Sequence, residues 1–389
     1  MIIELHLLQS FPVSNLNRDD VGQPKTATFG GAVRGRVSSQ CLKRSARQLL
    51  PEHGLKEDET GVRTKRLRDQ AAEMLAGRGH GRDLTTDIAT AGLESLGLGV
   101  EASSGRTEYL LFVNRQAVDV LADHCERHWD ELVAAVEAKR AAQAKAKEGG
   151  KGAKSNKKED KAKNAGKKNI ADTRRLLDAG RAVDIALFGR MIADNKEFNV
   201  DAASQVAHAL STHAVTTEFD YYTAVDDQRP DEDSGADMIG TVDFNSACYY
   251  RYANVNLERL RRNLGGDEEL LGRAARAWLG AFIHAVPSGK QNSMAALTLP
   301  HTLLGVVRDA GSWNLANAFL KPVGGSDLMA TSTDRLLSHL AQLRRFYGGT
   351  QLRAVVGASV DGHLPSLPVE EVAGDLASFV DRVATTAVG

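Results

Sequence analysis

The apolar and polar positions of the chain predict an alternation of strands, loops and helices from the first residues onward. IIELHLL, at Ile2–Leu8, alternates with a period of two and predicts a half-buried strand. The next stretch, SFPVSNLNRDDVGQPKTATFGGAV, is rich in Pro, Gly, Asn and Asp and predicts a long loop of the kind that carries function. A short strand at Arg34–Val37 then leads to a helix that Ser38 or Ser39 caps and that ends near Leu50.

The rest of the chain mixes helical and β-prone segments, without an internal repeat. Residues 60–136 favour helices, most clearly at Arg63–Leu75 and Arg115–Val136. The order of all these elements predicts an α+β fold, with a small sheet, two crossing helices and long excursions. The later elements that we expect are a helical turn at Asp172–Leu177, a buried strand at Val183–Met191, β structure at Val206–Val225, a strand at Thr241–Leu257, and helices at Asp267–Ala285, Thr333–Tyr347 and Asp375–Val383.

Composition places the chain among ordinary globular proteins. Its 389 residues allow two or three domains, and a hydrophobic fraction of 42% supports real cores. No apolar run approaches the ~20 residues that span a bilayer, and the N-terminus lacks the basic region of a signal peptide. Cys41, Cys125 and Cys248 lie far apart without a CxxC pair, which argues against a zinc module or a disulfide framework. We expect reduced thiols in a cytoplasmic protein without membrane contact.

A net charge of −1 hides strongly charged segments of opposite sign. The Ala/Lys/Gly-rich segment 139–168 holds 12 Lys and Arg against 3 acids, whereas residues 218–237 hold 8 acids and only Arg229. The first part of the lysine-rich segment can extend the preceding helix, and residues 149–169 predict a mobile, solvated loop. The acidic DDQRPDEDSGAD predicts a flexible tip or hinge.

The densest cluster of positive charge outside the lysine-rich segment is RGRVSSQCLKRSAR, from Arg34 to Arg47. At ~100° per residue, four polar side chains of the predicted helix form one stripe, while Leu42, Ala46, Leu49 and Leu50 fall on the opposite side. The stripe consists of Gln40, Lys43, Arg44 and Arg47.

This helix suits a phosphate chain. Its N-terminus, behind Ser38, Ser39 and Gln40, offers free N–H groups and the positive end of the helix dipole to an anion. Arg18 and Lys25 in the preceding loop add charge, and the pair Gly30-Gly31 permits a close backbone approach to a ligand. Such contacts position a nucleic acid without reading its sequence. A solvated helix face remains the alternative.

Three further motifs fit nucleic-acid binding, each beside a simpler explanation. Arg190 and Met191 follow the predicted buried strand, where Met can wedge against a base or simply fill a core. Tyr221 and Tyr222 can stack on a base or pack within a strand. SGKQ, at residues 288–291, lacks the phosphate-loop frame, so that a lone Lys290 reaching a phosphate is the most it indicates.

Signals for catalysis are poor. HCERH places His124 and His128 four residues apart but lacks the glutamate of HExxH, so we expect a surface helix with two histidines. His208 and His213 lack an evident partner for general-base chemistry. The acid pairs Asp19-Asp20 and Asp226-Asp227 are more typical of solvated or capping residues than of metal ligands. We therefore expect no catalytic residues, no metal and no cofactor.

The ordered motifs resemble one family along nearly the whole chain. SNLNRDDVGQPKTATFGGAVRGRVSSQCLKRSAR is similar to the N-terminal signature of the CasC family, the backbone subunit of the type I-E CRISPR surveillance complex Cascade. VDIALFGRM, QVAHALSTHAVTTEFDYYTAVDD, FNSACYYRYANVNL, VPSGKQ and ANAF continue the resemblance. The lysine-rich segment 139–168 is the main departure from the family's pattern.

The resemblance implies a fold shaped like a right hand. It has a palm of the RNA-recognition (ferredoxin-like) type, a helical fingers domain and a thumb β-hairpin. Several copies line up as a helical filament on the guide RNA (crRNA), with other Cascade subunits, and display its bases for pairing with target DNA in antiviral defence. The implied boundaries are palm at 1–58, fingers at 59–180, palm at 181–200, thumb at 201–240 and palm at 241–389.

The resemblance also implies roles for individual residues. The guide backbone is contacted by Arg18, Lys25, Ser38, Gln40, Lys43, Arg47, Lys290 and Gln291, and the displaced base is flanked by Met191 and Tyr222. Arg44 joins this set through the stripe argument, and Arg34, Ser39, Arg190 and Tyr221 join it as neighbours in the same motifs.

Three functions remain open at this point. The first is a non-catalytic guide-RNA-binding filament subunit. The second is a metal-independent endoribonuclease that processes precursor RNA, for which His6, His208 and His213 are the candidate bases. The third is an oligomeric scaffold whose basic face is only solvated.

Overall fold

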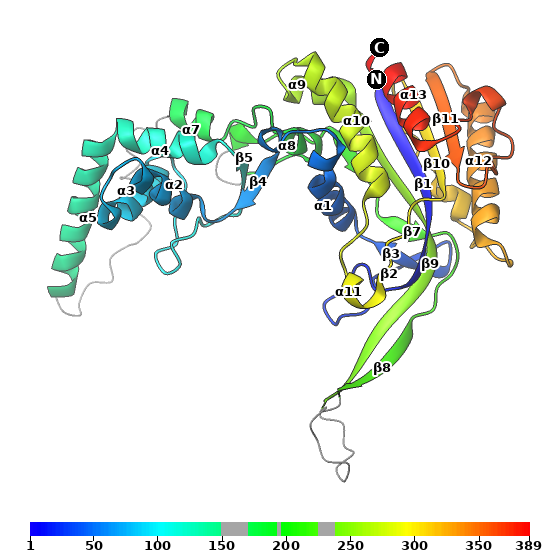
Figure 1. The fold of residues 1–389 in the computed structure, drawn as a ribbon, viewed down its shortest axis with the longest axis horizontal. Coiled ribbons are helices and arrows are strands. Elements are labelled where there is room, and N and C mark those ends of the chain that lie inside the picture. The colour runs from blue at the N-terminus through cyan, green and yellow to red at the C-terminus, as the bar shows by residue number, and fades with distance from the viewer. Residues whose placement is uncertain (149–169, 193–195, 225–237) are drawn as a thin grey trace, which may run out of the picture. The chain divides into compact units, whose positions relative to one another are not determined.

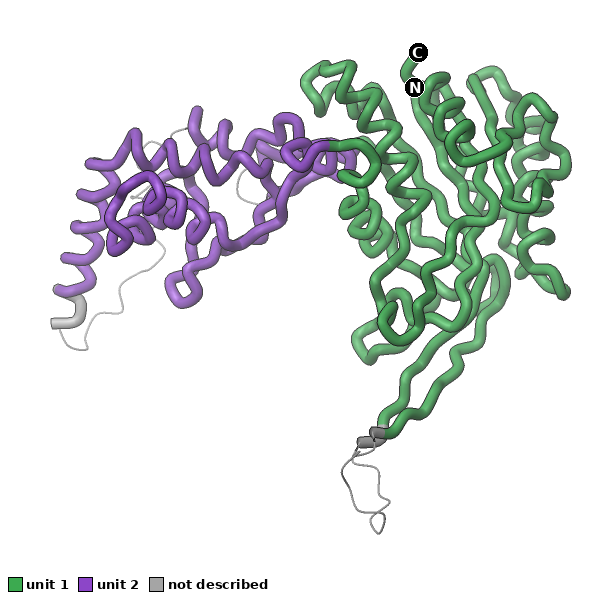
Figure 2. Tube along the Cα trace, in the orientation of Figure 1, with its two compact units in different colours: residues 1–55, 203–389 green, residues 56–202 purple. Residues whose placement is uncertain are grey.

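The computed structural model of the chain describes residues 1–148, 170–192, 196–224 and 238–389. It divides into two compact units, residues 1–55 with 203–389 and residues 56–202 (Figure 2). Residues 181–200, which the resemblance assigns to the palm, lie in the second unit. Most of the lysine-rich segment and the acidic tip fall outside the described residues.

A large antiparallel sheet organises unit 1 (Figure 1), which confirms the predicted α+β class but not the predicted small sheet. Its described strands run in the order β11-β10-β1-β9-β7-β3-β2, and β6 and β8 also pair with β9. β1 is central, because Ile2–Leu8 pairs with β10 on one side and with β9 on the other. The strands are β1 (Ile2–Ser14), β2 (Thr26–Phe29), β3 (Ala32–Val37), β6 (Ser204–Val206), β7 (Ala209–Ser211), β8 (Glu218–Ala224), β9 (Met238–Asn256), β10 (Thr302–Arg308) and β11 (Leu352–Ser359).

Helices cover both faces of this sheet. On one face Gly305 of β10 packs against Phe379 and Val383 of α13, which in turn contacts α10. On the other, Leu8, Tyr250 and Tyr252 share a core cluster with residues of α12 and η4. The helices of unit 1 are α1 (Ser39–Leu49), η1 (Pro51–His53), α9 (Leu257–Asn263), α10 (Glu268–His284), α11 (Gln291–Met294), η4 (Leu315–Phe319), α12 (Leu328–Tyr347), η5 (Val369–Glu371) and α13 (Leu376–Val388).

The prediction that the first strand is half-buried is wrong, because β1 is covered on both faces. Glu4 and His6, whose alternation suggested a solvent face, are each 1% exposed. Glu4 accepts a hydrogen bond from the Tyr252 hydroxyl at 2.8 Å, and His6 Nδ1 lies 2.8 Å from the Tyr250 hydroxyl. These hydrogen bonds satisfy the two buried polar side chains without water.

The predicted long loop is partly a strand and a hairpin. β1 continues to Ser14, and Thr26–Phe29 pairs with Ala32–Val37 around the turn at Gly30 and Gly31. Both glycines have positive φ, which non-glycine residues rarely adopt. The close approach at Gly30 is to Leu320, since a Cβ at Gly30 would lie 1.7 Å from the Leu320 carbonyl oxygen. Gly30 therefore serves packing within the protein rather than a ligand.

Unit 2 is mainly helical, as the sequence predicts for residues 60–136. Its core includes buried residues from α2, α3, α4, α5, β5 and α7, among them Leu75, Ile88 and Leu121. Its elements are η2 (Glu57–Glu59), β4 (Gly61–Thr64), α2 (Leu67–Gly77), α3 (Arg82–Ser95), β5 (Leu111–Asn114), α4 (Ala117–Arg127), α5 (Trp129–Glu148), α7 (Ile170–Leu176), α8 (Val183–Phe188) and η3 (Lys196–Phe198). α5 extends into the lysine-rich segment, where Lys139 and Arg140 pair with Glu94 and Asp87 of α3.

Val183–Met191, predicted as a buried strand, instead begins with the helix α8 at Val183–Phe188. The run is buried from Val183 to Leu187, and burial on all sides gives the same apolar pattern in a short helix as in a strand. Asp184 in the first turn of α8 is buried, and its carboxylate accepts hydrogen bonds from the Gly61 N–H at 2.6 Å and from the Ile185 N–H at 3.0 Å.

Most of the predicted elements of unit 1 are present, whereas α9, β10 and β11 had no predicted counterpart. β7 and β8 lie within the predicted β region, β6 ends where that region begins, and β9 covers the predicted strand except for Leu257. Asp267 and Asp327 cap α10 and α12 by accepting hydrogen bonds from Leu270 and Ala330 N–H, each at 2.9 Å. Within the described residues, no helix is long and apolar enough to cross a bilayer. The three cysteines are free thiols.

Candidate nucleic-acid interface

The α1 helix of unit 1 has the two faces that its sequence predicts. Leu42 and Ala46 are 1% exposed and pack inward, while Gln40 and Arg44 face solvent. Burying a leucine of this kind stabilises the fold by roughly 1.5–3 kcal/mol. Lys43 and Arg47 are half-buried at the edge between the two faces. The apolar contacts thus fix the direction in which the polar stripe points.

Ser38 caps α1, as predicted, and the N-terminus is held by side chains from two other segments. The Ser38 hydroxyl accepts from Cys41 N–H at 3.3 Å, and Ser38 N–H donates to Asn17 Oδ1 at 2.9 Å. Ser39 N–H donates to His208 Nδ1 at 3.1 Å. The first turn of α1 contains no acidic residue, so the positive end of the helix dipole is not offset locally.

Lys25, Arg36 and Arg44 surround this helix start. Lys25 N–H donates to the Asn17 carbonyl at 2.9 Å and its carbonyl accepts from Arg36 N–H at 2.8 Å, which fixes the β2 entry beside α1. The guanidinium of Arg36 lies 3.4 Å from His208 Nδ1. No acidic partner of Lys25, Lys43 or Arg44 occurs among the described residues, so their charge is available to an anion.

The positive charge of these side chains affects the pKa values of His208 and Cys41. Burial lowers the pKa of His208, and the charges of Arg36 and Lys25 lower it further. Burial raises the pKa of the Cys41 thiol, against the opposing effect of Arg44 and Lys25. The charge of Lys25 therefore affects both His208 and Cys41 at the α1 start. Burial also lowers the pKa of Lys43, an effect that a nearby phosphate would oppose.

The loop between β1 and β2 is ordered by its own polar residues. Buried Asn15 donates to the carbonyls of Gly22 at 3.0 Å and Asp243 at 2.8 Å. Asp19 accepts from the N–H groups of Val21 and Gln23, which confirms a capping role for this acid. Arg18 is exposed on this loop, and no acidic partner for it lies in the part of the chain that the structure describes.

The SGKQ segment packs against the same loop. A Cβ on Gly289 would lie 2.3 Å from the Leu16 carbonyl oxygen, so only glycine permits this approach. Lys290 adopts a positive φ of 52° and is half-buried. Gln291 donates its amide to the Pro287 carbonyl at 2.9 Å, which holds the turn. The turn before Lys290 thus lies against the loop that carries Arg18.

Two of the predicted contact residues are buried and bonded within the protein. Arg34 is 0% exposed, and its guanidinium donates to the carbonyls of Ser211 at 2.9 Å and Phe319 at 2.8 Å. Arg190 is 7% exposed and donates to the carbonyls of Phe112, Leu177 and Phe198 in unit 2. These are corrections to the predicted set, because neither guanidinium is available to a phosphate. Met191, by contrast, is 86% exposed.

Tyr221 and Tyr222 lie on the β8–β9 hairpin. They pair with Thr241 and Gly240, and their side chains point to opposite faces because they are adjacent in a strand. Tyr222 lies over Gly240, where a Cβ would come within 2.5 Å of its ring. Tyr221 is 58% exposed and shares its face with Phe219, which is 73% exposed.

Two residues at the α1 start and one on the β8–β9 hairpin were not assigned to the RNA-binding set from the sequence. Arg36 and His208 lie at the α1 start, but His208 is distant in sequence and only the pairing of β3 with β7 brings it there. Phe219 could have been found, because it precedes Tyr221 by two residues in a β-prone segment. The expectation that HCERH forms a surface helix with two histidines is wrong for His124, which is 2% exposed.

The chain is similar over nearly its whole length to a known protein family and to solved structures. The model of the family described as "CT1975-like protein" matches residues 3–382. The chain belongs to this CT1975-like family. A solved structure titled "CRISPR RNA-guided surveillance complex, pre-nicking" contains a chain that is 31% identical, with 100% of both chains covered and a TM-score of 0.82. A second, titled "CRISPR RNA-guided surveillance complex", is 28% identical over 100% of both chains, with a TM-score of 0.71.

These matches confirm the resemblance to a Cascade backbone subunit that the sequence motifs indicated. No curated protein sequence matches the chain. Over its whole length, the CT1975-like chain is therefore similar to chains of complexes that are described as RNA-guided.

Proposed function

We propose that this CT1975-like protein is a non-catalytic, guide-RNA-binding subunit of a type I-E CRISPR surveillance complex. Several copies line the guide as a filament, together with other Cascade subunits. They hold its backbone and leave its bases free to pair with target DNA in antiviral defence. Base pairing then recognises the target sequence, and the protein binds the backbone of the guide, as in other RNA-guided effectors.

The observation that carries the proposal is the surface around the start of α1. Lys25, Lys43 and Arg44 lack acidic partners among the described residues, and the positive end of the α1 dipole adds to their charge. The N–H groups of Ser38, Ser39 and Cys41 are already hydrogen-bonded within the protein, so the side chains supply the anion contacts. Arg18 and Lys290 extend the surface along two loops that touch each other. Phosphates of one strand are several ångströms apart, so one surface of this size engages more than one of them.

The candidate bases give little support to the endoribonuclease alternative. His6 is 1% exposed within the sheet, where it contacts Tyr250. His213 Nε2 accepts from Cys248 N–H at 3.2 Å, and His208 Nδ1 accepts from Ser39 N–H at 3.1 Å. Two of the three histidines thus use a ring nitrogen to accept from the backbone, and the third is buried. A base that removes a proton from an RNA hydroxyl needs such a nitrogen to be accessible.

Purification of the full chain after co-expression with a guide-encoding repeat array tests the proposal. We expect an elongated particle with an absorbance maximum near 260 nm that retains intact RNA at moderate salt. The RNA should persist at its full length on prolonged incubation. Release of shortened RNA with multiple turnovers would support the endoribonuclease instead, and an RNA-free particle would support a plain scaffold; either result overturns the proposal.

A further inference from the structure

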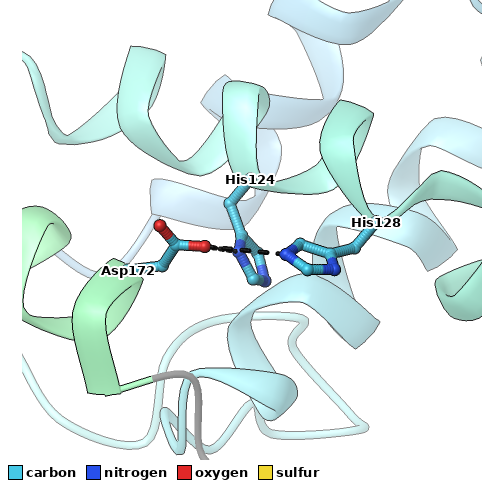
Figure 3. A group of neighbouring side chains, drawn as sticks. All are labelled: His124, His128 and Asp172. Carbon is cyan, nitrogen blue, oxygen red and sulfur yellow. Dashed lines mark hydrogen bonds and ion pairs between the residues drawn. The ribbon is translucent and has the colours of Figure 1, made fainter.

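The end of α4 and the start of α7 in unit 2 bring two imidazoles and a carboxylate together (Figure 3). His124 Nδ1 lies 2.9 Å from Asp172 Oδ2, and His128 Nε2 lies 3.7 Å from the same oxygen. The three ligand atoms that these residues offer all lie within 4.8 Å of one another. His124 and His128 are four residues apart, so that one helical turn places both rings on the same side.

Each of these three side chains has a second partner on its outer side. His124 Nε2 lies 2.9 Å from Ser95 Oγ, and His128 Nδ1 lies 3.3 Å from Glu131 Oε2. Arg127 donates to the other oxygen of Asp172, Oδ1, at 3.0 Å. Metal-bound histidines and carboxylates characteristically have such outer partners, which fix the ring orientation and the tautomer.

The Ser95 hydroxyl also lies 2.7 Å from the Gly92 carbonyl, so that it links the backbone of α3 to His124. On the inner side of the cluster, His124 Nδ1 faces the Asp172 carboxylate at 2.9 Å. An imidazole nitrogen and a carboxylate oxygen at this separation hold either a proton or a metal ion between them.

We propose that His124, His128 and Asp172 bind one divalent transition-metal ion of the Zn²⁺ class. His124 contributes Nδ1, His128 contributes Nε2 and Asp172 contributes Oδ2, with water at the fourth position. A tetrahedral zinc site with ligands at 2.0–2.2 Å has ligand–ligand distances of about 3.4 Å, and the observed 2.9 and 3.7 Å lie on either side of this value. Two imidazoles and one carboxylate suit Zn²⁺ better than Mg²⁺ or Ca²⁺.

The burial of the ligands indicates where the water lies. The side chains of His124 and Asp172 are 2% and 4% exposed, whereas that of His128 is 29% exposed. The open position is therefore on the His128 side. The ion joins α4 to α7, two helices of unit 2 that the chain connects through α5 and residues 149–169. Its binding free energy contributes to the folding of this unit, and the role is independent of the RNA-binding proposal.

Metal titration of the untagged full chain, stripped with a chelator, tests the site. We expect one Zn²⁺ per chain by calorimetry, an increase in melting temperature with Zn²⁺ and not with Mg²⁺, and a visible Co²⁺ absorption typical of tetrahedral coordination. His128→Ala removes a partly exposed ligand and is expected to fold. It should weaken Zn²⁺ binding at least about tenfold, because loss of an outer partner alone costs this much.

His363→Ala is the matched control, because His363 is an exposed histidine that also pairs with a carboxylate, that of Asp334, at 2.7 Å. It should leave the Zn²⁺ stoichiometry and affinity unchanged. Asp172→Asn should also lose the Co²⁺ spectrum. Equal Zn²⁺ binding by the wild type and His128→Ala, or no stoichiometric binding by the wild type, would refute the site.

Discussion

Residues of the same type serve opposite purposes in the first basic motif of this chain. Arg34 is buried and donates to two backbone carbonyls, whereas Arg44, ten residues later, is exposed without an acidic partner in the described ranges. Burial rather than residue type separates the guanidinium that holds the fold from the one that is available to a ligand. A charged group on a polar surface costs little to remove, but its loss from an interior leaves unpaired acceptors.

Arg34→Ala is therefore expected to lower the free energy of unfolding by about 3 kcal/mol, because charge-assisted hydrogen bonds are worth about 1.5–3 kcal/mol each. Arg44→Ala should change it by less than about 0.5 kcal/mol, as surface substitutions usually do. Urea unfolding of the two RNA-free variants measures the difference. Similar stability losses for both would mean that Arg44 also supports the fold.

Residue patterns predicted the α1 surface well and the buried polar groups poorly. The stripe of Gln40, Lys43 and Arg44 follows from helical spacing and a serine cap, which are local. Burial of Arg34 depends on carbonyls of Ser211 and Phe319, which lie more than 170 residues away in the chain. His124 is buried for the same kind of reason, since α7 closes over it through Asp172.

At the scale of elements, the β8–β9 hairpin divides its aromatic residues between two faces. Tyr222 covers Gly240, as a large side chain often does for a glycine across a strand pair, and so belongs partly to the hairpin itself. Phe219 and Tyr221 are exposed on the other face. The sequence placed both tyrosines in one candidate site, and only strand pairing shows that their roles differ.

We expect Tyr221→Ala to reduce RNA-particle assembly, because stacking on a base is worth about 1–3 kcal/mol. The melting temperature of the RNA-free chain should change by less than about 2 °C, since the side chain is mostly exposed. Phe346→Ala, which removes an aromatic residue of 80% exposure from α12, is the control. A melting-temperature loss proportional to the assembly loss would assign Tyr221 a packing role instead.

α8 shows why one element was predicted wrongly. A short run that is buried on every side contains no period that separates a helix from a strand. Here the run is helical, and its buried Asp184 carboxylate bonds to the N–H groups of Gly61 and Ile185. β1 shows the converse, because its period of two is real but both faces are covered. In both elements the tertiary environment, rather than the local pattern, determines the outcome.

At the scale of the whole molecule, the two units carry different candidate sites. Unit 1 supplies the basic surface around α1, and unit 2 is a helical body with a candidate metal site. The match to subunits of RNA-guided surveillance complexes extends over the full chain, so both units belong to the shared architecture. The α+β class was predictable from element order, whereas the division at residues 55 and 202 required the structure.

The central claim is that the α1 surface holds an RNA backbone by its phosphates. Its most direct test is the affinity of the purified full chain for a labelled guide RNA, measured by anisotropy over a range of salt concentrations. Each phosphate contact in a single strand contributes about −0.7 to the slope of log affinity against log salt. Lys25→Ala with Arg44→Ala should therefore weaken binding and make the slope shallower by about 1.4.

Arg262→Ala with Arg345→Ala removes the same charge from exposed positions on α9 and α12 and serves as the control. This control should retain the wild-type slope to within experimental error. The account predicts a shallower slope for the α1-surface variant alone. A wild-type slope and affinity in that variant, or the same loss in the control, would contradict it.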